Sequence, residues 1–145
     1  MRRLSGLIAA ALLVAGVNLA WAQTPVINPS RVEFDSADHA VACPADSCIT
    51  GYRVEVWLPT VDPATGSPVS QNVVAKGMVG TTGATPAYKI DRAAWGVSFA
   101  PGVTYVLRLV AIGEGTVQSA RSLPSGPFAR TATAGAVPSS VRVVP

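Results

Sequence analysis

Apolar and polar side chains alternate along much of the chain after residue 22, as they do in strands that bury one face. The alternation is clearest in two segments, residues 52–58 and residues 104–112. One face of the first segment carries Tyr52, Val54, Val56 and Leu58. One face of the second segment carries Tyr105, Leu107, Leu109 and Ala111. We expect these two segments to be the principal strands.

Shorter strand candidates occupy much of the remaining chain. They lie at residues 31–35, 69–74, 76–79, 88–91 and 116–121. Residues 59–68 and 80–86 are rich in turn-forming residues, which predicts loops. Residues 91–95 can hold one helical turn, but no window of ten residues has helical periodicity. Several short strands separated by turns predict an all-β fold, an antiparallel β-sandwich.

The first 22 residues have the features of a secretory signal peptide. Arg2 and Arg3 precede an apolar run of eleven residues from Leu7 to Val17, and Ala20-Trp21-Ala22 is a small-x-small cleavage site. The alternative is an uncleaved N-terminal anchor, but a membrane-spanning helix needs about 20 apolar residues. We expect cleavage after Ala22, export to the periplasm or the extracellular space, and no stable membrane insertion afterwards.

Removal of the signal peptide changes the overall charge. The whole chain has 11 Lys and Arg against 8 Asp and Glu, and the balance without Arg2 and Arg3 is 9 against 8. A nucleic-acid-binding face needs clustered basic residues, so no nucleic-acid partner is expected. The length predicts one domain at residues 23–130, with a C-terminal tail at residues 131–145 that is a loose extension or an edge strand. A loose tail is the preferred interpretation.

The two cysteines, Cys43 and Cys48, are separated by four residues. In an exported protein such a pair is expected to form a disulfide. A zinc site needs further ligands, and His39 is the only histidine of the chain. The spacing also differs from the Cys-x-x-Cys motif of redox-active pairs. We therefore expect a Cys43–Cys48 disulfide that closes a short loop.

Three segments resemble the fibronectin type III family. Residues Ile49–Val56 resemble its third strand, Phe99–Ala111 its Leu-x-Pro-Gly-x-x-Tyr corner and sixth strand, and Ser122–Pro127 its final strand. The resemblance covers residues 31–130 and implies an immunoglobulin-like or fibronectin type III-like β-sandwich. It also implies a role for Tyr105, whose ring caps the core while its hydroxyl bonds to upstream backbone.

The N-terminal part of the domain departs from the family pattern. No tryptophan lies on a second strand, and Phe34 is the only large apolar residue available for that position. The segment Phe34–His39 is similar to one in a group of small exported bacterial domains, which implies no activity.

Candidate chemistry is sparse. Asp35, Asp38 and His39 form the only cluster of acids with a histidine, and Ser36 lies beside them. A hydrolase needs a positioned nucleophile and an oxyanion hole, and no Gly-x-Ser-x-Gly elbow occurs in the chain. We interpret the cluster as a turn in which aspartate side chains bond to nearby backbone. No catalytic residue, bound metal or cofactor is predicted.

Trp57 is the residue that suggests binding. It falls on the face opposite Tyr52, and pairing of the third and sixth strands would place Arg53, Glu55 and Arg108 on that same outer face. We interpret these charges as contributing to solubility and strand register. Trp57, Arg53 and Arg108 form the candidate binding face, since outward tryptophan and arginine are common at interfaces.

Two alternatives remain for Trp57: the loop at residues 59–68 covers it, or a shifted register places it in the core. Trp95 is expected to be buried before Phe99. The predicted function is an exported, non-enzymatic binding or adhesion-type module for an unknown protein or surface glycan. The alternative is a structural or self-assembling subunit of the envelope or the extracellular space.

Overall fold

The computed structural model describes residues 23–131, so the expected signal peptide and residues 132–145 of the expected tail lie outside the described residues. The strands are β1 (Val26–Ile27), β2 (Arg31–Phe34), β3 (Ile49–Trp57), β4 (Ser70–Ala75), β5 (Gly80–Thr81), β6 (Tyr88–Asp91), β7 (Val106–Gly113) and β8 (Phe128–Ala129). Three single 3₁₀ turns interrupt them, η2 (Lys76–Met78), η3 (Arg92–Ala94) and η4 (Glu114–Thr116). In this described part of the chain no α-helix occurs, so the all-β prediction is confirmed. No helix there is long and apolar enough to cross a membrane.

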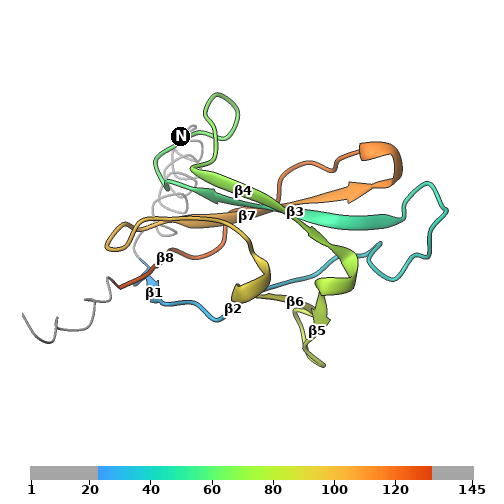
Figure 1. Ribbon diagram of the computed structural model, residues 1–145, viewed down its shortest axis with the longest axis horizontal. Coiled ribbons are helices and arrows are strands. Elements are labelled where there is room, and N and C mark those ends of the chain that lie inside the picture. Colours follow the sequence, from blue (N-terminus) through green and yellow to red (C-terminus); the bar gives the residue numbers. More distant parts are fainter. Residues whose placement is uncertain (1–22, 132–145) are drawn as a thin grey trace, which may run out of the picture.

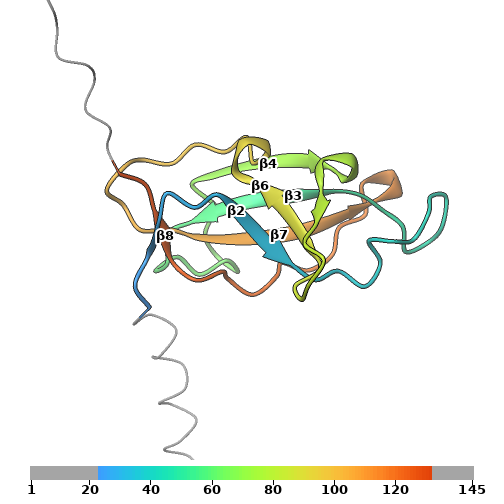
Figure 2. The ribbon, with the colours of Figure 1, turned by 90° about the horizontal axis from the view of Figure 1, so that it is seen from below.

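The strands form two antiparallel sheets and one parallel pair (Figure 1). Strand β3 lies in the middle of the first sheet, between β4 and β7, and β6 lies between β2 and β5 in the second. Strands β1 and β8 pair in parallel, Val26 with Phe128 and Ile27 with Ala129. Figure 2 shows β2 and β6 lying across the face of β3 and β7.

One hydrophobic core joins the two sheets. The first sheet contributes the inner faces of β3 and β7, and the second contributes Ile90, which has no exposed surface. The segments that follow β6 and precede β7 add Trp95, Val97, Phe99 and Tyr105. Each fully buried side chain of this size contributes about 1.5–3 kcal/mol. The alternation predicted for residues 52–56 and 105–111 therefore identified the inner faces of both principal strands, whereas Leu58 lies beyond β3 and is exposed.

Two side chains predicted at the sequence level have the expected contacts. Tyr105 is 3% exposed, and its hydroxyl accepts a hydrogen bond from the backbone N–H of Ala100 at 3.1 Å. Trp95 is 1% exposed, and its indole N–H donates to the carbonyl of Ile90 at 3.0 Å. Both bonds tie the segment between β6 and β7 to the core, and this fixes the position of Phe99.

Two predicted strands are absent, and three short strands, β1, β5 and β8, were not predicted. Residues 76–79 were expected to be extended, but η2 occupies Lys76–Met78 because the chain crosses here from the first sheet to the second. Strand β5 then begins at Gly80, inside the segment expected to be a loop. Residues 116–121 were also expected to form a strand, but η4 and an irregular segment take its place.

The irregular segment contains a serine at every third position, and we call residues 119–125 the serine segment. Ser119, Ser122 and Ser125 each donate their N–H to a β7 carbonyl, at 2.8–3.0 Å. Each serine hydroxyl also accepts the N–H of the same β7 residue at 2.9 Å. The β7 partners are Leu107, Leu109 and Ala111. Serine hydroxyls thus accept hydrogen bonds from the N–H groups at the β7 edge, which a regular strand was expected to cover.

Candidate functional site

The structure places the three residues of the predicted binding face on β3 and β7, but the tryptophan is not on the surface. Trp57 lies on the outer face of β3, as the alternation predicted, yet only 1% of it is exposed. The guanidinium of Arg121 lies over its ring, 5.2 Å from the ring centroid. Its indole N–H donates to the carboxylate of Glu55 at 2.9 Å. The expectation that Trp57 is exposed is therefore corrected: Arg121 lies over the ring, and the one donor of the ring bonds to Glu55.

The two arginines of the predicted face are also engaged. Arg53 donates to Glu55 at 2.9 Å and to the side-chain oxygen of Gln118 at 2.8 Å. Arg108 lies opposite Glu55 in the β3–β7 register, but its guanidinium donates to the carbonyl of Ser122 at 2.9 Å. The cross-strand neighbours therefore share a face without forming the expected charge pair.

Glu55 is the centre of this outer face. Its side chain has no exposed surface and accepts from Arg53, Trp57 and Arg121. Burial acts to raise the pKa of Glu55, but hydrogen bonds from Arg121, Trp57 and Arg53 hold the pKa below the ordinary value of a glutamate. Sequence reasoning missed Arg121, because it lies 66 positions away in a segment with no strand pattern. We interpret this cluster as a structural network.

Tyr52 forms hydrogen bonds with two residues of the predicted cluster, Ser36 and His39. The hydroxyl of Tyr52 donates to Ser36 at 3.0 Å and lies 2.8 Å from Nδ1 of His39. Burial, and then the charge of Lys76, lower the pKa of His39. Asp35 accepts the backbone N–H of Ala87 at 2.8 Å, so it bonds to backbone, but 52 positions away and not within its own turn as expected. The hydroxyl of Tyr52 lies between the imidazole of His39 and the hydroxyl of Ser36.

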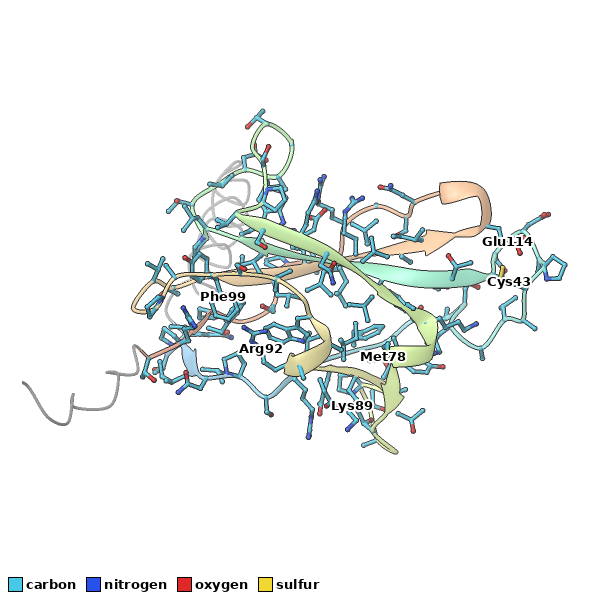
Figure 3. All side chains as sticks on the ribbon, viewed as in Figure 1. Cys43, Met78, Lys89, Arg92, Phe99 and Glu114 are labelled. Carbon is cyan, nitrogen blue, oxygen red and sulfur yellow. A yellow bond between two sulfur atoms is a disulfide. The ribbon has the colours of Figure 1, made fainter. Side chains whose placement is uncertain are left out.

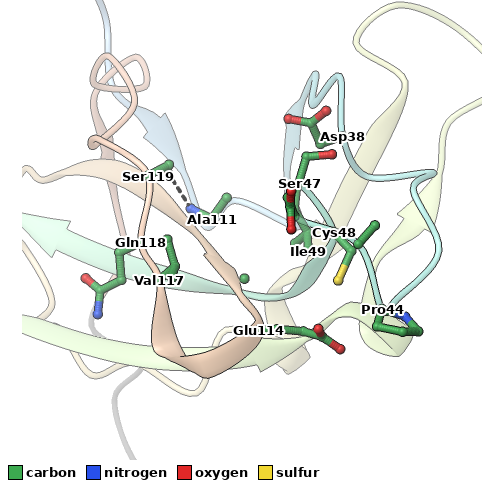
Figure 4. Close-up of a pocket in the computed structure, with 13 residues that line it drawn as sticks. Asp38, Pro44, Ser47, Cys48, Ile49, Ala111, Glu114, Val117, Gln118 and Ser119 are labelled. Carbon is green, nitrogen blue, oxygen red and sulfur yellow. Dashed lines mark hydrogen bonds between the residues drawn. The ribbon is translucent and has the colours of Figure 1, made fainter.

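A cavity lies beside the disulfide, at one end of the first sheet (Figure 4). It has a volume of about 590 Å³ between the loop at Asp38–Cys48 and the segment after β7. The disulfide joins Cys43 and Cys48, as predicted, and the carboxylate of Glu114 lies within 4.8 Å of both sulfur atoms. Sulfurs bonded to each other are not thiolate ligands, so this cavity has no donor set for a soft metal ion.

Two arginines, Arg92 and Arg130, lie beside the ring of Phe99, and Figure 3 labels Arg92 and Phe99. The guanidinium carbon of Arg92 is 4.6 Å from the centroid of the Phe99 ring and 5.0 Å from that of Trp95. The guanidinium carbon of Arg130 is 6.0 Å from the same Phe99 centroid. We call Arg92 and Arg130 the arginine pair.

Backbone hydrogen bonds hold the arginine pair in place. The N–H of Arg92, which follows β6 directly, donates to the carbonyl of Ser30 at 2.8 Å. The carbonyl of Arg130, which follows β8, accepts the N–H of Gly102 at 2.9 Å. Both arginines line a shallow hollow of about 260 Å³ together with Asn28, Pro29 and Phe99.

The arginine pair has no acidic partner. Among residues 23–131, the ion pairs of arginine join Arg31 to Glu33, and Arg53 and Arg121 to Glu55, and none includes Arg92 or Arg130. Burial, followed by the charge of Arg130, lowers the pKa of Arg92. Two like charges held near each other, one of them half-buried, are stabilised when an anion lies between them. This hollow is therefore the candidate functional site.

Sequence reasoning did not identify this site because its residues are separated by most of the domain. No family model, no curated protein and no solved structure matches this chain. What the arginine pair binds is therefore argued below from its own chemistry.

Proposed function

We propose that this chain is an exported, non-enzymatic binding module and that the arginine pair holds an anionic group of its ligand. We further propose a fibronectin type III-like β-sandwich for its fold. The hydrogen bond from Ala100 to Tyr105 and the core shared by two antiparallel sheets support the fold. The Cys43–Cys48 disulfide supports export, because disulfides persist in oxidising compartments.

One observation carries the binding proposal: two guanidinium groups contact one aromatic ring and have no carboxylate partner in the described part of the chain. A guanidinium presents its N–H donors in a planar fork that matches two oxygens of a carboxylate, sulfate or phosphate. The ring contacts with Phe99 hold both forks without using their in-plane donors. The site is therefore arranged to receive an oxyanion.

The ligand class follows from the charge of the whole domain. The predicted mature chain is close to neutral, so long-range attraction to a dense polyanion is weak. The side-chain amide of Asn28 also lines the hollow next to the arginines. Its nitrogen donates to the hydroxyl of Thr131 at 3.1 Å and its oxygen accepts the N–H of Thr131 at 3.0 Å, so its second N–H and second lone pair are what it can offer to a hydroxyl group. A sugar that carries both an acidic group and hydroxyls fits this combination. We therefore propose an acidic surface glycan as the ligand.

The test is a titration of the mature chain with carboxylated, sulfated and phosphorylated oligosaccharides. We expect at least one class to bind. Replacement of Arg92 or Arg130 with glutamine removes a charged hydrogen bond worth about 1.5–3 kcal/mol, so affinity should fall about tenfold or more. Arg31→Gln is the matched control, because it removes one exposed positive charge that is paired with Glu33. The affinity of this control variant for the same oligosaccharides should be nearly unchanged.

Two results would contradict the proposal. One is an equal loss in the Arg31→Gln control, which would indicate a general charge effect. The other is unchanged affinity in the double variant Arg92→Gln, Arg130→Gln. If the chain bound an acidic peptide but no oligosaccharide, the proposed anion site would stand and the proposed glycan ligand would be rejected. Thermal melting of each variant checks that the fold is retained.

A further inference from the structure

Gln23 lies at a groove lined by four prolines. The groove has a volume of about 480 Å³, and its apolar lining consists of Pro25, Pro59, Pro124, Pro127 and Val106. In the part of the chain that the structure describes, no acidic side chain lines it. The groove is thus an apolar surface with no carboxylate to neutralise a positive charge.

The side chain of Gln23 is close to the opposite wall of this groove. A Cβ atom added to Gly126 would be 3.0 Å from the side-chain oxygen of Gln23, tighter than ordinary van der Waals contact. Nearby, the N–H of Val26 donates to the carbonyl of Pro127 at 3.0 Å, where β1 and β8 pair. The absence of a side chain at Gly126 allows the glutamine amide to approach its backbone.

Gln23 is also the residue that export would place at the N-terminus. Cleavage after Ala22 leaves glutamine with a free α-amine. We propose that this residue cyclises to pyroglutamate and that the proline-lined groove holds the resulting ring. This inference rests on the proposed export of the chain.

The reaction needs no partner that the protein does not supply. The α-nitrogen of Gln23 attacks the side-chain amide carbon, a C–N bond forms, and the bond to the amide nitrogen breaks. The departing amide nitrogen takes up the proton that the α-nitrogen releases and leaves as ammonia, and no atom changes its oxidation state. The product is a neutral five-membered lactam.

The groove favours this product for two reasons. In the described part of the chain, the lining of the groove holds no carboxylate that would stabilise a terminal ammonium at Gln23, so the charged form gains no counter-charge there. A larger fraction of the amine is then neutral and able to act as a nucleophile. After cyclisation the charge is gone, and a small ring can pack against the proline rings.

The first test identifies the N-terminus of the exported, full-length protein by mass spectrometry and stepwise N-terminal degradation. We expect a first peptide that begins at Gln23, is lighter by one ammonia and is blocked to degradation. A Gln23 terminus with a free amine overturns the modification but leaves export intact. A terminus at any other residue, or an uncleaved chain, overturns the premise as well.

The second test separates the groove from ordinary glutamine chemistry. The folded chain with a newly released Gln23 terminus is compared with a peptide of residues 23–30, which has the same terminus and no groove. We expect cyclisation to be several-fold faster in the folded chain. Gly126→Leu should reduce that advantage, because its side chain would occupy the space of the Gln23 amide. A folded-chain rate no greater than that of the peptide overturns the role of the groove.

Discussion

The guanidinium of Arg121 donates to the carboxylate of Glu55 at 2.7 Å, although 66 positions separate the two residues. This bond attaches the serine segment to the outer face of β3. Because Glu55 has no exposed surface, its charge has left bulk water and depends on Arg121, Arg53 and Trp57 for compensation. Side chains joined by charged hydrogen bonds therefore cover the outer face of the first sheet, whereas its inner face packs in the apolar core.

Replacement of Glu55 with glutamine should destabilise the domain strongly. Loss of one partner from a buried ion pair costs about 3–5 kcal/mol, and we expect the lower end because Arg53 and Arg121 both retain some exposure. Urea unfolding measures the change. Glu33→Gln is the control, since the exposed pair with Arg31 is worth at most about 1 kcal/mol. Similar losses in both variants would contradict the network.

Stability should fall when the pH is lowered below about 6.5, the ordinary pKa of histidine. Burial and the charge of Lys76 lower the pKa of His39 in the folded chain. Below pH 6.5 the unfolded chain therefore binds more protons at His39 than the folded chain does. The free energy of unfolding consequently decreases as the pH falls from 6.5 towards the lower pKa of His39 in the folded chain.

His39 is the only histidine of the chain, so His39→Gln should flatten the pH dependence of stability between pH 6.5 and the onset of carboxylate titration. Unfolding by urea at a series of pH values provides the measurement. If the stability of the variant depended on pH as steeply as that of the parent chain, the pH dependence would come from a group other than His39.

Replacement of Tyr105 with phenylalanine should cost about 1 kcal/mol, the net value of a typical hydrogen bond, since the ring is retained. Tyr88→Phe is the matched control, because the half-buried Tyr88 contacts Phe34 and His39 through its ring. Thermal or urea unfolding of the two variants should show a loss for Tyr105→Phe alone. An equal effect in both would mean that the bond from Ala100 contributes nothing measurable.

Local patterns predicted the parts of the fold that local geometry determines. Alternation assigned the inner faces of β3 and β7, because successive side chains of a strand always point to opposite faces. The same rule placed Trp57 on the outer face, but it does not report whether another segment covers that face. Arg121 provides the cover, and no spacing in the sequence links it to Trp57.

The candidate site was missed for the same physical reason. Arg92 and Arg130 meet at Phe99 only because β6 and β8 end at the same side of the core. A regular strand was expected at residues 116–121, but the serines pair with β7 at every third residue of their own segment and every second residue of β7. Such pairing uses side-chain hydroxyls, and a strand pattern does not represent it.

The serine segment also limits how copies of this chain can join. Serine hydroxyls occupy the β7 amides, and Pro124 and Pro127 have no N–H to offer a further strand. At the other edge of the first sheet, the segment after β6 lies beside β4: the side-chain amide of Asn72 donates to the carbonyl of Trp95 at 3.1 Å, and the N–H of Ser98 donates to the hydroxyl of Ser70 at 3.0 Å. Within the part of the chain that the structure describes, we therefore expect both edges of this sheet to resist pairing with a strand of a second copy.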